Sequence, residues 1–253
     1  MNRLDGKTIL VAGAAGLLGS RVVKSVLDVG AKVIAADLSL EAMHEKLNNE
    51  DIVSDNILLE QLDITNEQSV SNLFAKHRGI SGAVNCTYPR NSAYGTHFLD
   101  VKMTDFNENL ALHLGSSFLF TQQCAKYFKL HQSAFSLVNI SSIYGVIAPK
   151  FEVYESTAMT MPVEYAAIKS ALLHLSRYAV KYIKDSRFRI NSVSPGGIFD
   201  SQPDAFLAEY KKHTNGEGML SVNDILGAII FLLSDDSKFA TGQNIIVDDG
   251  FSL

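Results

Sequence analysis

The stretch "ILVAGAAGLLGSRVV" (residues 9–23) decides the fold, because three glycines join an apolar run to a helical pattern. Gly13, Gly16 and Gly19 allow a tight turn and a close backbone approach to a pyrophosphate, which the free N–H groups of the following helix attract. Asp37 ends the next apolar run, 18 residues after Gly19 (37 − 19). An acid at that spacing accepts hydrogen bonds from the ribose hydroxyls of a dinucleotide. The stretch therefore predicts a dinucleotide-binding turn; the alternative is a helix–strand junction that serves only packing.

The acid at position 37 also bears on which dinucleotide binds. Asp37 would repel a 2′-phosphate, and the surrounding "AADLSLEAM" (35–43) contains no arginine or lysine to hold one. NAD is therefore expected in preference to NADP.

Apolar runs that read as strands alternate with helical patterns along most of the chain. The strands are predicted at 7–13, 32–37, 57–64, 82–87, 135–141, 189–194 and 244–249. The helices are predicted at 17–30, 66–77, 105–128, 163–184 and 204–213. This alternation predicts a parallel sheet covered on both faces, a doubly wound α/β fold of about seven strands with ligands at the carboxyl ends of the strands.

The chain is expected to form one domain over residues 1–253, because no internal repeat, low-complexity tract or linker divides it. Two long irregular stretches follow late strands. We interpret 145–162 as an insertion loop and 197–219 as a substrate lid.

Composition argues against several classes of partner. With 47% hydrophobic and 19% charged residues the chain suits a soluble domain, and no apolar run reaches the ~20 residues that a membrane span needs. A net charge of −5 without a basic cluster argues against a nucleic-acid partner. Cys86 and Cys124 are the only cysteines and form no metal-ligand pattern. We therefore expect a cytoplasmic protein with free thiols, no metal site and no membrane partner.

A second stretch, "MPVEYAAIKSALLHL" (161–175), places Tyr165 four residues before Lys169, so that both lie on one face of a predicted helix. Further motifs follow in order: Asp63-Ile64, Asn85 in "VNCTYP", Ser142 in "NISSIYG", Asn191 with Pro195 and Gly196, and the closing "TGQNIIVDDG". Together with the glycine turn they resemble the short-chain dehydrogenase/reductase family across essentially the whole chain.

The resemblance implies a role for each of these positions. It makes Tyr165 the acid or base, lets Lys169 lower the pKa of Tyr165 and anchor the nicotinamide ribose, and lets Ser142 hold the reacting oxygen. It assigns cofactor binding to Gly13, Gly16, Leu18, Gly19, Asp37, Asp63, Ile64, Asn85, Tyr165, Lys169, Pro195, Gly196 and Ile198. The alternatives are a surface pair for Tyr165 and Lys169, and for Ser142 a hydroxyl that satisfies backbone groups.

Departures from the family pattern indicate a subgroup. "AGAAGLLG" has the glycine spacing of the family's extended branch, with Ala12 in place of its threonine, and 23 positions (165 − 142) separate Ser142 from Tyr165. The intervening run resembles that of nucleotide-sugar epimerases and dehydratases. The segments "NCTYPRN", "LALHLGSSF" and "SSIYGVIAPKFEVYE" most resemble bacterial oxidoreductases of flagellin-modification clusters, which supply sugars, notably nonulosonic acids, for flagellin glycosylation.

The fourth catalytic position departs as well. The family places an asparagine where "HLGSSFLFTQ" has His113. A histidine there either relays protons itself, since its unperturbed pKa is ~6.5, or is a packed helix residue. Asn109, one turn earlier, is a substitute if the register shifts.

Residues that follow two of the strands are candidates for substrate binding. Arg90 and Lys150 are suited to a phosphate or carboxylate, the alternative for each being a solvated loop charge. Tyr88, Tyr144 and Tyr154 offer flat faces and hydroxyls suited to sugar rings, the alternative being local packing.

These observations predict an NAD-dependent oxidoreductase that acts on a hydroxyl or keto group of a sugar, sugar phosphate or nucleotide sugar, in the synthesis of a flagellin glycan precursor. Two alternatives stay open: a reductase of another small carbonyl compound, and a catalytically inactive NAD-binding regulator, which Ala12 and His113 permit. The resemblance also implies a homodimer or homotetramer that pairs through the helices at 105–128 and 163–184.

Overall fold

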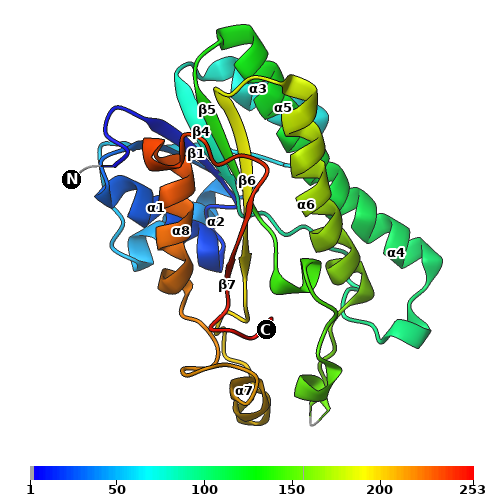
Figure 1. The fold of residues 1–253 in the computed structure, drawn as a ribbon. Helices are drawn as coiled ribbons and strands as arrows, with labels where there is room; N and C mark the ends of the chain where they lie inside the picture. Colours follow the sequence, from blue (N-terminus) through cyan, green and yellow to red (C-terminus); the bar gives the residue numbers. More distant parts are fainter. Residues whose placement is uncertain (1–2, 156) are drawn as a thin grey trace.

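The computed structural model describes residues 3–155 and 157–253, and its strands form a parallel sheet in the order β3-β2-β1-β4-β5-β6-β7 (Figure 1). The strands are β1 Thr8–Ala12, β2 Lys32–Asp37, β3 Ile57–Gln61, β4 Ile80–Asn85, β5 Phe135–Ile140, β6 Phe188–Pro195 and β7 Asn244–Val247. The strand order changes direction at β1, which pairs with both β2 and β4. The predicted doubly wound fold is therefore confirmed, and its ligand crevice is expected at the carboxyl ends of β1 and β4.

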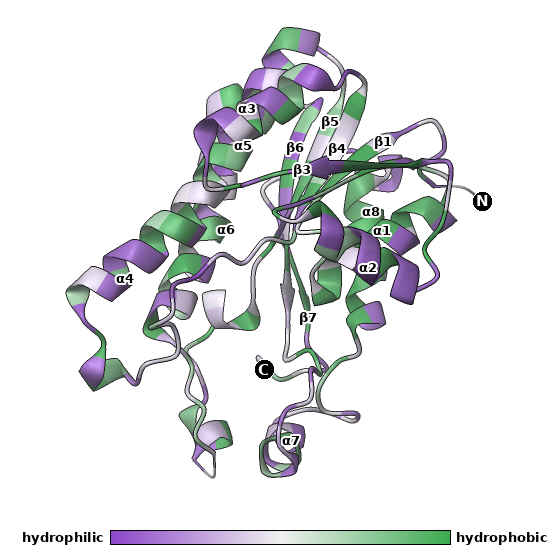
Figure 2. Cartoon of the chain, turned by 180° about the vertical axis from the view of Figure 1, so that it is seen from behind, coloured by the Kyte–Doolittle hydropathy of each residue, from purple (hydrophilic) through white to green (hydrophobic). Residues whose placement is uncertain are grey.

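Helices connect successive strands and cover both faces of the sheet. They are α1 Leu17–Asp28, α2 Leu40–Asn49, α3 Glu67–Lys76, α4 Met103–Asn109, α5 Ser116–His131, α6 Val163–Ile183, α7 Asp204–Lys211 and α8 Leu226–Leu233. α1, α2 and α8 lie on one face, whereas α3, α5 and α6 lie on the other (Figures 1 and 2). Figure 2 shows green hydrophobic residues along most of α8, which is packed into the core.

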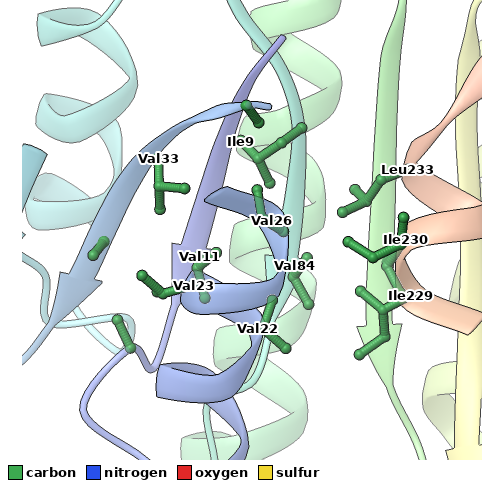
Figure 3. Close-up of a cluster of buried hydrophobic side chains, with 14 of the residues drawn as sticks. Ile9, Val11, Val22, Val23, Val26, Val33, Val84, Ile229, Ile230 and Leu233 are labelled. Atoms are coloured by element: carbon green, nitrogen blue, oxygen red, sulfur yellow. The ribbon is translucent and has the colours of Figure 1, made fainter. Parts of the chain in front are cut away.

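Two apolar cores hold these layers together, one on each face of the sheet. On the first face, Val22 and Val26 of α1 belong to the same cluster as Ile9 of β1 (Figure 3). On the second face, Phe120 and Phe128 of α5 fill the space between the helix and the strands. All five side chains are inaccessible to solvent, which is what fixes each helix against the sheet.

A third apolar cluster lies beyond the carboxyl ends of the strands. Its buried members are Ile143, Tyr144, Val153, Tyr154, Phe206, Tyr210 and Phe251. Ile143 and Tyr144 lie just before the predicted insertion (145–162), and Val153 and Tyr154 lie within it. The others come from α7 in the predicted lid (197–219) and from the segment 248–253 that follows β7. Residue 156 of the insertion lies outside the described residues.

Three helical features differ from the sequence predictions. The helix expected over 105–128 contains a π-helical turn, Leu110–Gly115, between α4 and α5. Such a turn accommodates an extra residue and changes which side chains share a helix face. α2 and α8 were not predicted: α2 is short and buries only two side chains, although Leu40, Met43 and Leu47 recur at helical spacing, and α8 is apolar on nearly every side, so it shows no clear helical period.

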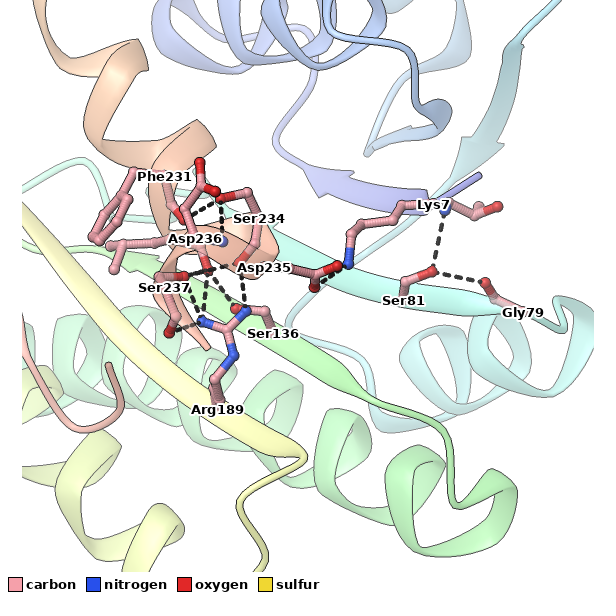
Figure 4. Close-up of polar contacts among 12 residues, drawn as sticks. Lys7, Gly79, Ser81, Ser136, Arg189, Phe231, Ser234, Asp235, Asp236 and Ser237 are labelled. Atoms are coloured by element: carbon pink, nitrogen blue, oxygen red, sulfur yellow. Dashed lines mark hydrogen bonds and ion pairs between the residues drawn. The ribbon is translucent and has the colours of Figure 1, made fainter. Parts of the chain in front are cut away.

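Arg189 of β6 fastens the end of α8 to the sheet (Figure 4). Its guanidinium donates to the carbonyl oxygens of Leu232, Ser234 and Ser237 at 3.1, 3.1 and 2.9 Å, and to the Ser237 hydroxyl at 2.6 Å. A buried cation at this place satisfies carbonyl groups that the end of a helix leaves without partners.

Among the helices of the described residues, none combines the length and apolarity that a bilayer span requires. Over the same residues, no group of three or more His, Cys, Asp or Glu side chains is arranged to hold a metal ion.

Candidate active site

The glycine turn between β1 and α1 is closed so tightly that side chains are excluded. Gly13 has a φ of 84°, in the left-handed region that favours glycine. A Cβ atom on Gly19 would lie 1.9 Å from the carbonyl oxygen of Gly13. α1 begins at Leu17 with no side-chain N-cap and no acidic residue in its first turn. The turn therefore fits a pyrophosphate, because no acidic side chain in the first turn of α1 opposes an anion at the helix N-terminus.

The residues predicted to bind adenosine lie together beside this turn. Asp37 ends β2, and its carboxylate accepts hydrogen bonds from the N–H groups of Ala15 at 2.8 Å and Leu38 at 2.7 Å. Its backbone carbonyl accepts the N–H of Leu62, just before Asp63 and the buried Ile64. Asp37 is thus held between the glycine turn and the end of β3, where an adenosine ribose is expected.

Asn85 braces the loop that follows β4. Its side-chain oxygen accepts the hydroxyl of Thr87 at 2.7 Å and the N–H of Thr87 at 3.2 Å, and its amide group lies 3.5 Å from the hydroxyl of Ser117 on α5. Asn85 is buried, whereas Cys86 and Thr87 line the cavity described next. The structure therefore places Asn85 behind the predicted cofactor site, as a support for its wall.

Ser142, Tyr165 and Lys169 converge on one cavity of about 450 Å³ at the carboxyl ends of the strands. Ser142 follows β5, and the other two come from the first two turns of α6. Leu18, Pro195, Gly196 and Ile198, all predicted to bind cofactor, line the same cavity. The cavity thus runs from the start of α1 to the predicted catalytic residues.

Lys169 is buried with its ammonium group directed at a small set of polar atoms. Nζ donates to the carbonyl oxygen of Ile140 at 2.8 Å, lies 3.5 Å from Nε2 of His113, and lies 5.4 Å from the centre of the Tyr165 ring. Burial lowers the pKa of Lys169 to about 7. The group is therefore poised to gain or lose a proton near neutral pH.

Tyr165 and Ser142 interact through their hydroxyl groups. Burial raises the pKa of Tyr165, and the hydrogen bond from the Ser142 side chain acts in the opposite direction. The Ser142 hydroxyl also accepts the N–H of Tyr144 at 3.2 Å, which fixes its position. The raised pKa means that the phenol keeps its proton at neutral pH.

His113 lies in the π-helical turn, in contact with these groups. Its ring packs edge-on against Tyr88 at a centroid distance of 5.0 Å. Its Nδ1 is buried and has no hydrogen-bond partner among the described residues. Burial, followed by the charge of Lys169, lowers the pKa of His113 to about 2, so the imidazole is neutral. His113 is therefore a packed residue that also lies next to Lys169; a role in proton relay stays a prediction.

Asn109 does not take the place of His113, because its amide is used elsewhere. Its Nδ2 donates to Asn91 at 3.0 Å and to Oε1 of Glu164 at 3.1 Å, and its oxygen accepts the N–H of Asn91 at 2.9 Å. Glu164 is completely buried beside Tyr165, and sequence reasoning missed it. The available signal was an acidic residue in the first turn of an otherwise apolar helix.

Comparison with known proteins agrees with this geometry. A family model described as enoyl-(acyl carrier protein) reductase matches residues 13–252. Post-translational flagellin modification protein A of Campylobacter coli is 39% identical over 99% of this chain and 100% of its own length. A short-chain dehydrogenase of Leptospira borgpetersenii, solved with bound NAD+, superposes with a TM-score of 0.87 at 30% identity, covering 100% of this chain and 95% of that one. The chain belongs to the short-chain dehydrogenase/reductase family.

As a member of this family the chain is an oxidoreductase, and more distant relatives show how widely the family's substrates vary. A 7alpha-hydroxysteroid dehydrogenase of Bacteroides fragilis is 26% identical over 100% of this chain and 97% of its own length. The predicted family resemblance, including its likeness to a flagellin-modification protein, is confirmed.

The substrate candidates of this short-chain dehydrogenase divide into two groups. Tyr88, Tyr144 and Tyr154 line the cavity, and the hydroxyl of Tyr154 donates to that of Tyr144 at 3.4 Å. Arg90 and Lys150 are not among the lining residues. The Arg90 guanidinium lies 4.8 Å over the Tyr88 ring, and Lys150 Nζ donates to the carbonyl oxygen of Phe251 at 2.7 Å.

Sequence reasoning missed several residues that complete the cavity wall. They are Met159, Thr160, Met161, Pro162, Gln202, Phe206, Tyr210 and Met219. They belong to the two irregular stretches, whose positions were predicted. Phe206 and Tyr210 lie one turn apart on the predicted helix 204–213, but the other six lie outside helices and strands, where inward-facing side chains have no periodic pattern in sequence.

Proposed function

We propose that the protein is an NAD-dependent oxidoreductase that interconverts a hydroxyl and a keto group of a sugar, sugar phosphate or nucleotide sugar, in the synthesis of a flagellin glycan precursor in the cytoplasm. The observation that carries the proposal is the convergence of Ser142, Tyr165 and Lys169 on one cavity beside the glycine turn. The flagellin modification protein of Campylobacter coli supports the pathway, and the tyrosine-lined cavity supports a polyhydroxylated substrate.

Each catalytic residue has one task in this reaction. A bound nicotinamide dinucleotide supplies the hydride acceptor or donor. Tyr165 accepts the hydroxyl proton of the alcohol during oxidation, or donates it to the carbonyl oxygen during reduction. Lys169, in its charged form, stabilises the phenolate of Tyr165, and Ser142 donates a hydrogen bond to the reacting oxygen as charge develops on it.

His113 is proposed to pass the proton onward. Its Nε2 lies 3.5 Å from Lys169 Nζ, and Nδ1 is buried on the far side of the ring. A neutral imidazole can exchange a proton with the Lys169 ammonium at Nε2, and because Nδ1 has no partner among the described residues, a water molecule would have to accept the proton released there. His113 would in this way replace the family's asparagine.

The preference for NAD rests on Asp37. Its carboxylate is fixed by two backbone N–H groups next to the predicted ribose site, where it favours hydroxyl donors and repels a 2′-phosphate. We also propose that two or four copies assemble through α4–α5 and α6. Exposed aromatic side chains on α6, Tyr178 and Tyr182, support this interface.

The test is a spectroscopic assay with NAD and a panel of sugars, sugar phosphates and nucleotide sugars. The expected result is formation of reduced nicotinamide with at least one of them, lost in Tyr165→Phe while NAD binding measured by calorimetry persists. A hydroxysteroid in the same panel covers the alternative raised by the Bacteroides fragilis relative. NAD binding without turnover of any compound, unchanged in Tyr165→Phe, would instead identify an inactive regulator.

A further inference from the structure

The segment 248–253 after β7 is packed between the two irregular stretches that wall the cavity. Phe251, near its end, is completely buried. Its ring stacks on Tyr210 of α7 at a centroid distance of 4.3 Å and an interplanar angle of 16°, and meets Tyr144 edge-on at 6.2 Å. One side chain therefore touches both the lid and the start of the insertion region.

Lys150 holds this side chain from the insertion side. Its Nζ donates to the carbonyl oxygen of Phe251 at 2.7 Å and lies 4.6 Å from the centre of the Phe251 ring. A charge-assisted hydrogen bond combined with a cation–π contact is among the stronger interactions available to a partly buried lysine. The ammonium group is thus engaged within the protein, which leaves it unsuited to hold a substrate anion.

Asp249 holds the segment from the lid side. Its carboxylate accepts the N–H groups of Gly216 at 2.9 Å and Glu217 at 3.0 Å, and its carbonyl oxygen accepts the N–H of Asn215 at 2.9 Å. The backbone N–H groups of the lid segment after α7 therefore bind the segment 248–253, whose Phe251 is in contact with Lys150.

The contacts of the segment 248–253 with the lid and the insertion extend to the cavity through the third apolar cluster. Tyr144, Tyr154, Phe206 and Tyr210 are members of that cluster, and all four line the cavity. Tyr154 of the insertion and Phe206 of the lid are also in direct contact, with ring centroids 5.2 Å apart. A displacement of Phe251 would thus be transmitted to side chains that face the substrate.

We propose that Phe251 and Lys150 are positioning residues that fasten the lid to the insertion, so that the two stretches form one preassembled wall of the substrate site. The wall's role toward substrate rests on the proposed function. A preassembled wall spares the ordering of two long loops at the moment of binding, so its loss weakens substrate binding, whereas the glycine turn takes no part in the contacts of Phe251 and Lys150 and keeps its structure.

The first test compares Lys150→Met with Lys238→Met in the otherwise unchanged protein. Lys238 makes a similar cation–ring contact with the exposed Phe239, at 5.6 Å, on another part of the surface. In Lys150→Met we expect amide hydrogen exchange to accelerate about ten-fold in residues 204–219 and 144–154 together. We expect KM for the substrate to rise about ten-fold, with the Kd for NAD unchanged. Lys238→Met should alter none of these quantities.

The second test uses Phe251→Leu, which keeps an apolar side chain but removes the ring that stacks on Tyr210. It is matched by Phe239→Leu, with circular dichroism to verify that both variants fold. Faster exchange in the lid with a raised substrate KM is expected for Phe251→Leu alone.

The outcomes separate the two proposals. Unchanged exchange in both stretches of Lys150→Met, or faster exchange in only one of them, would overturn the fastening. Faster exchange in both stretches with an unaltered KM would overturn its role in positioning substrate. If the unaltered protein oxidises or reduces no compound in the panel, the proposed function fails, while the exchange measurements still decide whether the two stretches are fastened.

Discussion

At the scale of single residues, the site contains two groups, Tyr165 and Lys169, whose charged forms are both disfavoured by burial. Burial raises the pKa of the Tyr165 phenol and lowers the pKa of the Lys169 ammonium to about 7. If a phenolate and an ammonium form side by side, each lowers the free-energy cost of burying the other, since opposite charges attract. The proton transfer that the chemistry requires is therefore coupled to the charge on Lys169.

The burial of Lys169 predicts a pH-dependent stability. Because the pKa of Lys169 in the folded protein, about 7, lies below the 10.5 of a solvent-exposed lysine, the unfolded chain binds the extra proton between these pH values, and stability rises with pH across this window. The contribution is at most about 1.4 kcal/mol per pH unit. Urea unfolding of the cofactor-free protein should show Lys169→Met to be more stable than the parent at pH 6, with the difference shrinking toward pH 10.

Lys126→Met, which removes an exposed lysine of α5, is the control and should follow the parent at every pH. A Lys169→Met variant whose advantage is the same at pH 6 and pH 10 would show that the ammonium is not destabilised by burial.

The position of His113 predicts a graded response to substitution. His113→Asn, which restores the family residue, should keep kcat within about ten-fold, whereas His113→Leu should lower it about 10²–10⁴-fold because Lys169 then loses its polar contact with the side chain at position 113. Since the pKa of His113 is about 2, the imidazole itself should add no step near pH 6.5 to the pH profile of the parent. Steady-state kinetics measured from pH 5 to 9 test both the effect of the substitutions on kcat and the shape of the pH profile. Full activity in His113→Leu would show that the histidine is not part of the proton path.

At the scale of elements, sequence alone was enough to predict the strands on either side of the glycine turn and in the rest of the sheet. The seven strands were predicted within a few residues, because each is a short apolar run between turn signals. α8 was not predicted, because "LGAIIFLL" has no polar face to reveal its period. The π-helical turn was missed for a different reason: apolar spacing does not distinguish one extra residue in a turn from a continuous helix.

The closeness of Gly19 to the carbonyl of Gly13 predicts that even a methyl group is too large there. Gly19→Ala should displace α1 or open the turn, which costs about 1–3 kcal/mol of stability and abolishes measurable NAD binding. Gly227→Ala in α8 is the matched control, since its Cβ would meet nothing within 4 Å, and it should stabilise the fold by up to ~1 kcal/mol. Thermal unfolding and calorimetric titration with NAD measure both effects; tight NAD binding by Gly19→Ala would contradict the structure of the turn.

The network around Glu164 illustrates what sequence could not provide at the element scale. Asn91 follows β4, Asn109 ends α4 and Glu164 begins α6, so their contacts join three elements that are distant in sequence. Each residue alone reads as a polar residue near a helix or strand end. The network exists only because the fold brings these ends together next to Tyr165.

At the scale of the whole molecule, α6 carries an aromatic surface that the fold leaves exposed. Tyr178 and Tyr182 stack at a centroid distance of 6.2 Å with exposures of 63% and 76%. Light scattering should show that replacing both with serine lowers the assembled mass, because apolar area is lost from the proposed contact between copies. Val53→Ser, on an exposed loop, is the control and should leave the mass unchanged. A parent protein that is already monomeric would refute the proposed assembly.

The candidate site was predictable to the extent that it is built from local motifs. The glycine turn, Asp37, Ser142, Tyr165 and Lys169 each sit at a strand or helix end, and parallel topology brings such ends to one edge. The wall formed with the third cluster was not predictable. It depends on how Phe251 packs against stretches about forty and a hundred positions earlier, and an aromatic residue after the last strand gives no indication of that.

Arg189 has a consequence for how the molecule responds to salt. The Lys7–Asp235 ion pair near the same helix end is exposed on the Asp235 side, so added electrolyte screens it. The guanidinium of Arg189 is enclosed by carbonyl oxygens and a hydroxyl, out of reach of mobile ions. The junction of α8 with the sheet should therefore be as stable in molar sodium chloride as in dilute buffer. A melting curve taken in molar sodium chloride should show no loss of stability that originates at this end of the molecule.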